Sequence, residues 1–333
     1  MTLRWGILST AKIARAFAAP LLASGAAEVL AVASRDAERA AAFARDLGIP
    51  RSYGSYPELL ADPQIDAVYI GLPNSLHAEW ATVAVQAGKH VLCEKPLGVG
   101  REEAAAMFAA ADAAGVTLME AFMYRFHPRT LAVQELLRQG TIGELRLIRA
   151  GFGFTVSDPA NIRLSAELAG GALMDVGCYC VNFARMVAGK RPARVSATAQ
   201  WAGTGVDETL AATLEFPGDV LAQIACSLRT SQYHTAQIIG SEGAIEIDDA
   251  FVPAPDRPSS LRVRRGNRNP AVETIEFPPV NQYQREAEAF AQLLEDPYSA
   301  WPDMPRQETL DNLATIEALL RSARAGQPTE VTS

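Results

Sequence analysis

Residues 4–35 read RWGILSTAKIARAFAAPLLASGAAEVLAVASR, and this stretch predicts the fold of the first third of the chain. Residues 4–8 form an apolar run typical of a strand, residues 11–23 carry the pattern of a helix, and residues 29–33 form a second apolar run. Strands that are apolar on both faces and joined by helices indicate a parallel sheet covered on both sides.

The same alternation continues outward from this stretch. It predicts helices over residues 36–47, 76–87 and 101–114, with Asp36 as the N-cap of the first, and strands over residues 67–70, 90–93 and 116–120. We therefore expect a doubly wound α/β domain over residues 1–121.

After residue 121 the rhythm changes. Helices are predicted over residues 128–139 and 171–187, with a strand over residues 145–154 between them and a Gly-Gly pair at the start of the second helix. Strands then follow one another over residues 195–201, 210–216, 220–228, 236–239, 244–247, 261–265 and 272–277. Segments such as SLRVRR and VETIEF alternate apolar and polar residues, which indicates an antiparallel sheet with one wet face.

Helices over residues 282–295 and 305–324 end this region. We expect residues 122–333 to form a second, α+β domain with a large, mainly antiparallel open sheet, used for substrate binding and oligomerisation. Its C-terminal helices are able to pack back on the first domain.

The composition excludes several classes of protein. Of the 333 residues, 49% are hydrophobic and 20% charged, which permits a sizeable core and argues against disorder. The net charge of -8 argues against binding a nucleic-acid backbone. No apolar run approaches the roughly 18 residues of a membrane span, and MTLRWGILST enters the first strand without a basic leader segment. We expect a cytoplasmic enzyme with no nucleic-acid or membrane partner.

The four cysteines, Cys93, Cys178, Cys180 and Cys226, form no C-x-x-C pair. A metal site at Cys178 and Cys180 is possible in principle. Because no histidine lies nearby at ligand spacing, we instead expect buried, reduced thiols and no metal.

The first strand–helix junction is where a dinucleotide-binding fingerprint, G-x-G-x-x-G/A, would fall. The residues there are Ser9, Thr10, Ala11, Lys12, Ile13 and Ala14. The substitutes for the two glycines are small, so a pyrophosphate can approach the backbone and the free N–H groups of the helix. An ordinary tight turn is the alternative interpretation.

The end of the second strand bears on the choice between NAD and NADP. An acidic residue there would bind the ribose 2′-hydroxyl, whereas this chain has Ser34 and Arg35, with Arg39 one turn further on. A hydroxyl and guanidinium groups suit a 2′-phosphate, so we expect NADP. Two solvated surface arginines are the alternative, Asp36 weakens the signal, and NAD stays open.

Further segments carry a resemblance to a known family. They are VLCEKPL at residues 91–97, MEAFMYRFHP at 119–128 and GGALMDVGCYCVNF at 170–183, together with WGILSTAKIA at 5–14 and LPNSLH at 72–77. Over essentially its whole length the chain resembles the Gfo/Idh/MocA oxidoreductases, and within them the branch of dimeric dihydrodiol dehydrogenases and NADP-dependent D-xylose dehydrogenases. The resemblance implies a Rossmann domain that holds NADP(H).

The candidate catalytic residues are Lys95, Asp175 and Tyr179. Lys95 follows a buried strand, which places its ammonium at the carboxyl edge of a parallel sheet, where ligands bind. Asp175 and Tyr179 are four residues apart on a predicted helix and would share one face. The resemblance assigns Tyr179 as the general acid/base, Lys95 as its electrostatic partner and Asp175 as an orienter of the substrate, and it implies a cis Lys95–Pro96 bond. A core tyrosine and a surface lysine are the alternatives.

Other residues are expected around the two ligands. Those bordering the cofactor are Leu72, Pro73, Asn74, His77, Glu94, Lys95 and Arg125, besides the residues of the first two strand ends. Those facing the substrate are Tyr124, Arg125, Arg163, Asp175 and Tyr179, with Glu120, His127, Asn161 and Tyr283 as weaker candidates. His127 is equally placed to cap the helix that follows it, and His77 to be a helix residue with no role.

The predicted reaction is reversible hydride transfer between the nicotinamide C4 and a carbinol carbon of a sugar, polyol or trans-dihydrodiol, with Tyr179 taking the hydroxyl proton. Alternatives within the family are a keto-sugar, inosose or anhydro-sugar reductase and an enzyme with a permanently bound cofactor. An alternative outside catalysis is an NADP-binding sensor. Because the open sheet needs cover, we expect a homodimer or homotetramer.

Overall fold

The computed structural model describes residues 2–25, 27–266, 271–296 and 304–332. The chain divides into two compact units. The first comprises Met1–Phe126 with Asn281–Thr309, and the second comprises His127–Val280 with Leu310–Ser333. The sequence-based boundary after residue 121 falls within the opening segment of the first unit.

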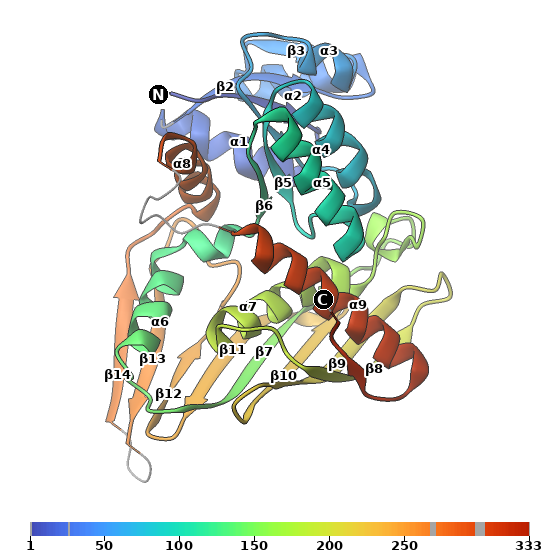
Figure 1. The fold of residues 1–333 in the computed structure, drawn as a ribbon. Helices are drawn as coiled ribbons and strands as arrows, with labels where there is room; N and C mark the ends of the chain where they lie inside the picture. The colour runs from blue at the N-terminus through green and yellow to red at the C-terminus, as the bar shows by residue number, and fades with distance from the viewer. Residues whose placement is uncertain (1, 26, 267–270, 297–303, 333) are drawn as a thin grey trace. The chain divides into compact units, whose positions relative to one another are not determined.

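A six-stranded parallel sheet forms the centre of the first unit (Figure 1). Its spatial order is β3-β2-β1-β4-β5-β6, the order of a Rossmann fold, which confirms the doubly wound prediction. The strands are β1 (Arg4–Leu8), β2 (Glu28–Ala33), β3 (Arg51–Tyr53), β4 (Ala67–Ile70), β5 (His90–Glu94) and β6 (Leu118–Ala121).

Helices accompany this sheet at the expected places. They are α1 (Lys12–Ser24), α2 (Ala37–Leu47), α3 (Tyr56–Leu60), α4 (His77–Gln86), α5 (Arg101–Ala114) and α8 (Gln282–Glu295), with 3-10 turns η1 (Asn74–Leu76) and η2 (Met123–Phe126). The sequence patterns missed β3 and α3, because segments of three and five residues are too short to show a period.

An aromatic cluster joins α8 to the beginning of the chain. The Trp5 ring lies 5.2 Å from Phe17 and 5.5 Å from Phe290, and Phe17 stacks on Tyr69 with ring centroids 4.0 Å apart. All four side chains are fully buried. A helix from late in the sequence therefore completes the core of the N-terminal unit.

A nine-stranded sheet forms the second unit, in the order β14-β13-β12-β11-β7-β10-β9-β8-β15. Only the β10–β7 pair is parallel among the pairs described, so the prediction of a mainly antiparallel sheet is confirmed. The strands are β7 (Leu145–Thr155), β8 (Arg194–Trp201), β9 (Asp207–Phe216), β10 (Val220–Ser227), β11 (Arg229–Gly240), β12 (Gly243–Ile247), β13 (Ser259–Arg265), β14 (Ala271–Phe277) and β15 (Thr329–Glu330).

The two faces of the large sheet differ. Helix α7 (Cys178–Ala188) packs on β7 and β10 on one face, and α9 (Arg306–Ala325) reaches β8 through Arg324, whose guanidinium lies 5.4 Å from the Trp201 ring. The other face forms a hollow of about 790 Å³. Its lining includes the small or polar side chains Ser196, Thr198, Ala211, Thr213, Gln223 and Thr235.

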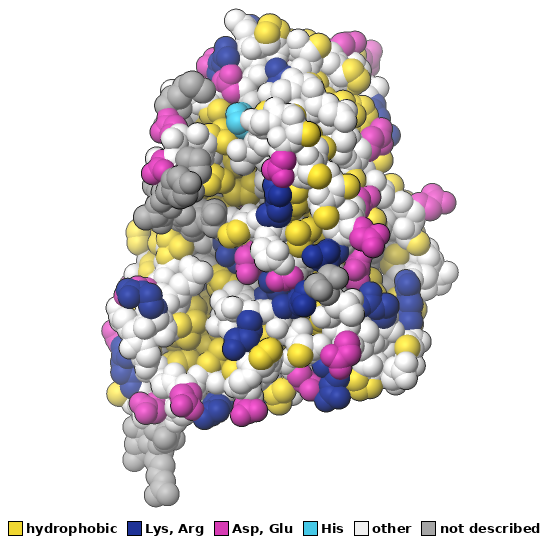
Figure 2. Space-filling model, viewed as in Figure 1, with side chains coloured by type: hydrophobic (Ala, Val, Ile, Leu, Met, Phe, Trp, Pro, Cys, Tyr) yellow, Lys and Arg dark blue, Asp and Glu magenta, His cyan; other side chains and the backbone are white. Residues whose placement is uncertain are grey.

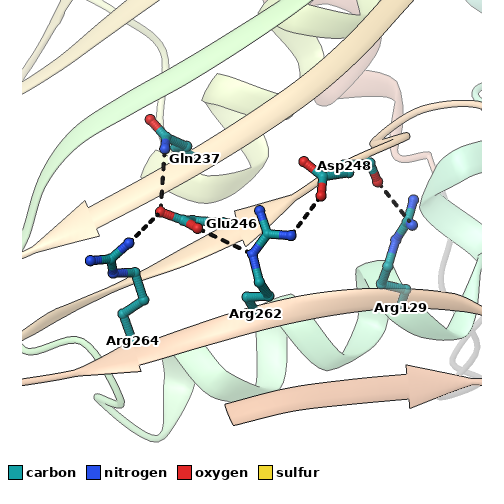
Figure 3. A network of polar contacts seen from close by, with 6 residues as sticks. All are labelled: Arg129, Gln237, Glu246, Asp248, Arg262 and Arg264. Carbon is teal, nitrogen blue, oxygen red and sulfur yellow. Dashed lines mark hydrogen bonds and ion pairs between the residues drawn. The ribbon is translucent and has the colours of Figure 1, made fainter. Parts of the chain in front are cut away.

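A polar network ties α6 (Pro128–Arg138) to strands β12 and β13 (Figure 3). The Arg129 guanidinium is buried and donates to the carbonyl oxygens of Asp248 at 3.3 Å, Asp249 at 2.7 Å and Ala250 at 3.1 Å. Arg262 bridges the carboxylates of Asp248 and Glu246, at 2.7 and 3.3 Å. One arginine thus donates to three carbonyl groups of this turn, of which the Ala250 carbonyl belongs to a buried residue.

The surface carries both signs of charge. On the part of the second unit drawn in Figure 2, Lys and Arg side chains alternate with Asp and Glu. Ion pairs such as Arg138–Glu135 and Arg262–Asp248 account for some of this mixing. None of the helices in the described ranges is both long and apolar enough to cross a bilayer.

Candidate functional site

The turn between β1 and α1 is built to leave backbone N–H groups available. Ser9 is buried with φ 155°, a conformation that favours glycine, and its hydroxyl oxygen accepts from the Ala11 N–H at 3.0 Å. Ala11 is the N-cap of α1 and has no side-chain acceptor of its own, and Ala11 and Lys12 are exposed. This start of a helix fits a pyrophosphate, as predicted for residues Ser9, Thr10, Ala11, Lys12 and Ile13.

The end of β2 presents the predicted basic side chains. Ser34 is buried, and its N–H donates to the Tyr53 carbonyl at 3.2 Å. Burial raises the pKa of Tyr56, and the nearby charge of Arg35 opposes this rise. The Asp36 carboxylate accepts from the N–H groups of Glu38 and Arg39, at 3.0 and 3.1 Å, so it caps α2 as predicted. The acidic residue that weakened the NADP signal is therefore committed to the helix.

The loop after β5, which carries Lys95, is fixed from several sides. The Glu94 carboxylate accepts from the Tyr69 hydroxyl at 2.5 Å and from the Lys95 N–H at 3.3 Å. The Leu97 N–H donates to Glu120 at 2.9 Å. The Lys95–Pro96 peptide bond is cis, as the resemblance implies. The backbone on both sides of Lys95 is thus held by hydrogen bonds at the carboxyl end of β5.

His77 joins this loop to the LPNSLH segment. Its ring nitrogens lie 2.9 Å from the Pro96 carbonyl oxygen and 2.9 Å from the Leu72 carbonyl oxygen, and the side chain is fully buried. Burial lowers the pKa of His77, which favours the neutral ring. With both ring nitrogens facing main-chain carbonyls, His77 positions the loop formed by Leu72, Pro73 and Asn74.

The segment at the end of the first unit is more enclosed than expected. Tyr124 is 1% and Arg125 9% exposed, and the Arg125 guanidinium lies 3.7 Å from the Glu308 carboxylate. His127 caps α6 by accepting from the Arg129 N–H at 3.1 Å, and burial lowers its pKa to about 4. Of its two expected roles, His127 fills the capping one.

In the second unit, the structure corrects the predicted helix over residues 171–187. It begins as a π-helical turn, η4 (Leu173–Gly177), and only then continues as α7. The π turn changes the local spacing, and Asp175 and Tyr179 lie four residues apart along one continuous helical segment. Their shared face stays a prediction.

Asp175 has a different partner. Its carboxylate accepts from the Arg163 Nε at 2.6 Å, and the Arg163 guanidinium lies 5.5 Å from the Phe154 ring. Asn161 caps the short turn η3 (Ile162–Leu164) that carries Arg163. The structure therefore brings Arg163, predicted from topology alone, into contact with Asp175.

Tyr179 lies in an aromatic wall. Its ring is 5.6 Å from those of Phe152 and Phe251, and the residue is 4% exposed. Cys178, Cys180 and Cys226 are buried nearby as free thiols, as is Cys93 in the first unit. Within the described residues, no group of three His, Cys, Asp or Glu side chains could hold a metal ion.

Two buried carboxyl groups were missed by the sequence patterns. Asp207, at the start of β9, accepts from the Leu173 N–H at 2.7 Å, and burial raises its pKa to about 6. Glu286, on α8, is fully buried, and its pKa is raised by burial and by Glu94. Tyr283, a weak substrate candidate, interacts electrostatically with both Glu94 and Glu286. The one sequence signal near Asp207 is the Gly170–Gly171 pair. The Asp207 carboxylate lies so close to Gly171 that a side chain on Gly171 would have no room.

Comparison with known proteins bears on this arrangement. Residues 3–122 match the model of an oxidoreductase family with an NAD-binding Rossmann fold, and residues 130–246 match the GFO/IDH/MocA C-terminal domain. The chain belongs to the Gfo/Idh/MocA oxidoreductases. The resemblance drawn from the sequence motifs is thereby confirmed, and the first unit of this Gfo/Idh/MocA protein is its nucleotide-binding part.

Two curated relatives of this Gfo/Idh/MocA member are enzymes. A D-xylose 1-dehydrogenase (NADP(+)) of Haloferax volcanii is 40% identical over 98% of this chain and 99% of its own. A trans-1,2-dihydrobenzene-1,2-diol dehydrogenase of Mus musculus is 42% identical over 76% of this chain and 77% of its own.

Among solved structures, a 3-ketoreductase from Actinomadura kijaniata in complex with NADP and TDP-benzene has a TM-score of 0.89 and 32% identity, covering 97% of this chain and 98% of that one. Further structures of that ketoreductase contain a tyrosine replaced by phenylalanine or a lysine replaced by alanine. The two replaced residues are separated along the chain by as many positions as Tyr179 and Lys95.

Proposed function

We propose that this protein is an NADP-dependent dehydrogenase or reductase that acts on a CH–OH group of a sugar, polyol or trans-dihydrodiol. The observation that carries the proposal is the pair Lys95 and Tyr179. Lys95 lies on the fixed loop after β5, and Tyr179 follows Asp175 by four residues on one helical segment. The separation of Lys95 and Tyr179 in the sequence equals that of a lysine and a tyrosine replaced in the ketoreductase.

The chemistry assigned to each side chain follows from its type. Bound NADP⁺ would supply the hydride acceptor. In the oxidation direction the Tyr179 phenol takes the proton of the substrate hydroxyl, and in reduction it returns it. The Lys95 ammonium favours the phenolate by its charge. Asp175 and Arg163 offer an acceptor and donors to neighbouring hydroxyl groups, which suits a ligand with several of them.

The cofactor preference is a second part of the proposal. Arg35 and Arg39, with the Ser34 hydroxyl, form the basic end of β2 that suits a 2′-phosphate. Replacing Arg35 by Ala should raise the KM for NADP about tenfold and leave that for NAD within about twofold. Equal changes for both cofactors would remove Arg35 from the phosphate site.

The decisive experiment follows absorbance at 340 nm. NADP and then NAD are offered with D-xylose, D-glucose, myo-inositol and a trans-dihydrodiol, using the wild type, Tyr179→Phe, Lys95→Ala and the control Tyr233→Phe. The control removes a tyrosine hydroxyl from the same unit, at a side chain packed against Gly151 and Gly153. We expect turnover that falls at least about 100-fold in Tyr179→Phe and not in Tyr233→Phe. Full activity in Tyr179→Phe would refute its role.

A keto-sugar reductase is the second candidate. It is favoured by the likeness to the ketoreductase, which extends over nearly the whole of both chains. Oxidation of NADPH with 3-keto sugars, together with no oxidation of the corresponding alcohols, would select it. Cofactor binding without turnover in either direction would select a sensor.

We further propose that the protein is a cytoplasmic homodimer or homotetramer. The hollow face of the large sheet carries small side chains at its centre and Arg149 and Arg262 among its charged residues, an arrangement that suits a second copy of the same sheet. The free cysteines suit a reducing compartment. Sedimentation should give a dimer or tetramer, and Ala211→Arg, at the centre of this face, should give monomers.

A further inference from the structure

Asp207 lies where β9 begins, at the N-terminal end of the segment that carries Asp175 and Tyr179. Its residue is 2% exposed, and its Oδ2 accepts from the Leu173 N–H at 2.7 Å. Leu173 is the first residue of the π-helical turn η4, which runs directly into α7. A buried carboxylate therefore takes one of the N–H groups that a helix leaves open at its start.

The neighbouring glycine shows how closely this contact is built. Gly171 has φ 115°, and a Cβ placed on it would lie 2.3 Å from the Asp207 Oδ1. The Gly171 carbonyl in turn accepts from the Asp175 N–H at 3.0 Å. The Asp207 carboxylate thus contacts the turn at Gly171 and Leu173. Gly171 is in turn hydrogen-bonded to Asp175 through its carbonyl oxygen.

The groups that face Asp207 are few and come from three elements. Arg324 of α9 is the cation that favours its charged form, and Cys226 of β10 is the buried thiol that interacts with it. Cys178 and Cys180 of α7 in turn interact with Cys226. The Arg163–Asp175 pair lies further along the same turn. The Asp207 carboxylate therefore fixes the start of the turn together with main-chain bonds, since the Gly170 and Gly171 N–H groups donate to the Ser165 and Arg163 carbonyls at 2.9 and 2.8 Å.

We propose that the ionised Asp207 is a positioning residue for the reaction, because its bond to the Leu173 N–H holds the π-helical turn and so fixes where Asp175 and Tyr179 stand. This inference rests on the proposed function for its effect on turnover. The predicted effect of Asp207 on the π-helical turn is independent of the proposed function.

The proposal separates stability from activity. Burial raises the pKa of Asp207 to about 6, so the folded state favours the protonated acid. Stability from this group is present in full below the unfolded pKa and is lost as the pH rises through about 6. The ionised Asp207 carboxylate, which we propose to be needed for turnover, is thus the form in which the folded protein is less stable. Asp207→Asn should therefore raise the melting temperature at pH 8 and lower the rate of the reaction.

The experiment compares the wild type with Asp207→Asn and the matched control Glu208→Gln, which removes one charge from the next residue of the same strand, where it pairs with Arg229. We measure kcat/KM between pH 5 and 8, melting temperatures, and hydrogen exchange of peptides spanning residues 170–183. Asn keeps an acceptor for the Leu173 N–H but not the charge that strengthens this bond. For Asp207→Asn we therefore expect about a tenfold lower kcat/KM at pH 8, no acid decline near pH 6, faster exchange in these peptides and a higher melting temperature. Glu208→Gln should follow the wild type.

Each result is decisive. Wild-type kcat/KM and exchange in Asp207→Asn would overturn the proposal, and so would a loss of both activity and melting temperature, which indicates a merely structural acid. If no substrate turns over, the proposed function fails, and hydrogen exchange then decides on Asp207 alone. Exchange in residues 170–183 that is unaffected by the substitution would overturn it in that case too.

Discussion

Ser9 combines a side-chain hydrogen bond with a backbone conformation that glycine adopts more easily. Its hydroxyl oxygen serves the Ala11 N–H at the start of α1, yet its backbone has φ 155°, where side chains are uncommon. A glycine would relax the backbone and lose the acceptor. Serine in place of the first glycine of the fingerprint therefore strains the backbone at residue 9 but gains a hydrogen bond to the Ala11 N–H.

Two substitutions separate these contributions. Ser9→Gly and Ser9→Ala both delete the hydroxyl, but only Ser9→Ala keeps a side chain in the strained conformation. We expect Ser9→Gly to be more stable than Ser9→Ala by about 1 kcal/mol in urea unfolding, and to bind NADP more tightly. Equal unfolding free energies would show that the turn adapts to a Cβ without strain.

At the scale of the element, helix α8 carries a fully buried acidic side chain, Glu286. Among the described residues, neither carboxylate oxygen of Glu286 has a hydrogen-bond partner, and Glu94 lies near enough to raise its pKa further. A raised pKa means that the folded state holds the proton. The stability that the group supplies is then present below the unfolded pKa and is lost as the pH rises.

Replacing Glu286 by Gln tests this assignment. The amide resembles the protonated acid, so the variant should match the wild type near pH 5 and exceed it by about 1–3 kcal/mol at pH 8. Glu288→Gln, on the same helix but paired with Arg285, is the control and should show no such gain. A destabilised Glu286→Gln at pH 8 would mean that the carboxylate is charged and has a partner.

Helix α6 depends on its second residue. Arg129→Met should destabilise the protein by about 2 kcal/mol, because it removes the donor of the buried Ala250 carbonyl and of the part-buried carbonyls of Asp248 and Asp249. Arg138→Met, at the exposed end of the same helix, removes only a surface pair with Glu135 and should change stability by less than about 0.5 kcal/mol. Similar losses in urea unfolding for the two variants would contradict the importance of the buried contacts.

The elements also show what a sequence can reveal. The strand-and-helix alternation predicted the parallel sheet, and the motifs identified the Lys95 loop and the Asp36 cap, because each depends on local pattern. The π-helical turn and the bond from Leu173 to Asp207 depend on contacts between distant segments. The burial of Arg125 and the pairing of Arg163 with Asp175 arise in the same way, so no local pattern could reveal them.

For the molecule as a whole, the four histidines share one property. His77, His90, His127 and His234 all have a lowered pKa, with burial as the main cause in each. The unfolded chain therefore takes up these protons at a higher pH than the folded protein does. Stability from the neutral rings is lost as the pH falls below about 6.5.

We therefore expect the free energy of unfolding to fall between pH 7 and pH 5, despite the opposite contributions of Asp207 and Glu286. His127→Asn retains an oxygen that can cap α6 but does not titrate in this range. It should lose about 2 kcal/mol less than the wild type over the same interval, because the pKa of His127 is lowered to about 4. The same decline in both proteins would assign the acid sensitivity to other groups.

The divided first unit has a consequence for biosynthesis. Trp5 leaves the ribosome long before Phe290, the ring that covers it, because strands β7 to β14 of the second sheet are translated between them. Until then the nascent nucleotide-binding half exposes an apolar surface that awaits α8, and chaperones have a defined patch to bind. Translation of α8 and of the residues up to Thr309, rather than of the first strands, sets the moment at which the nucleotide-binding unit becomes complete.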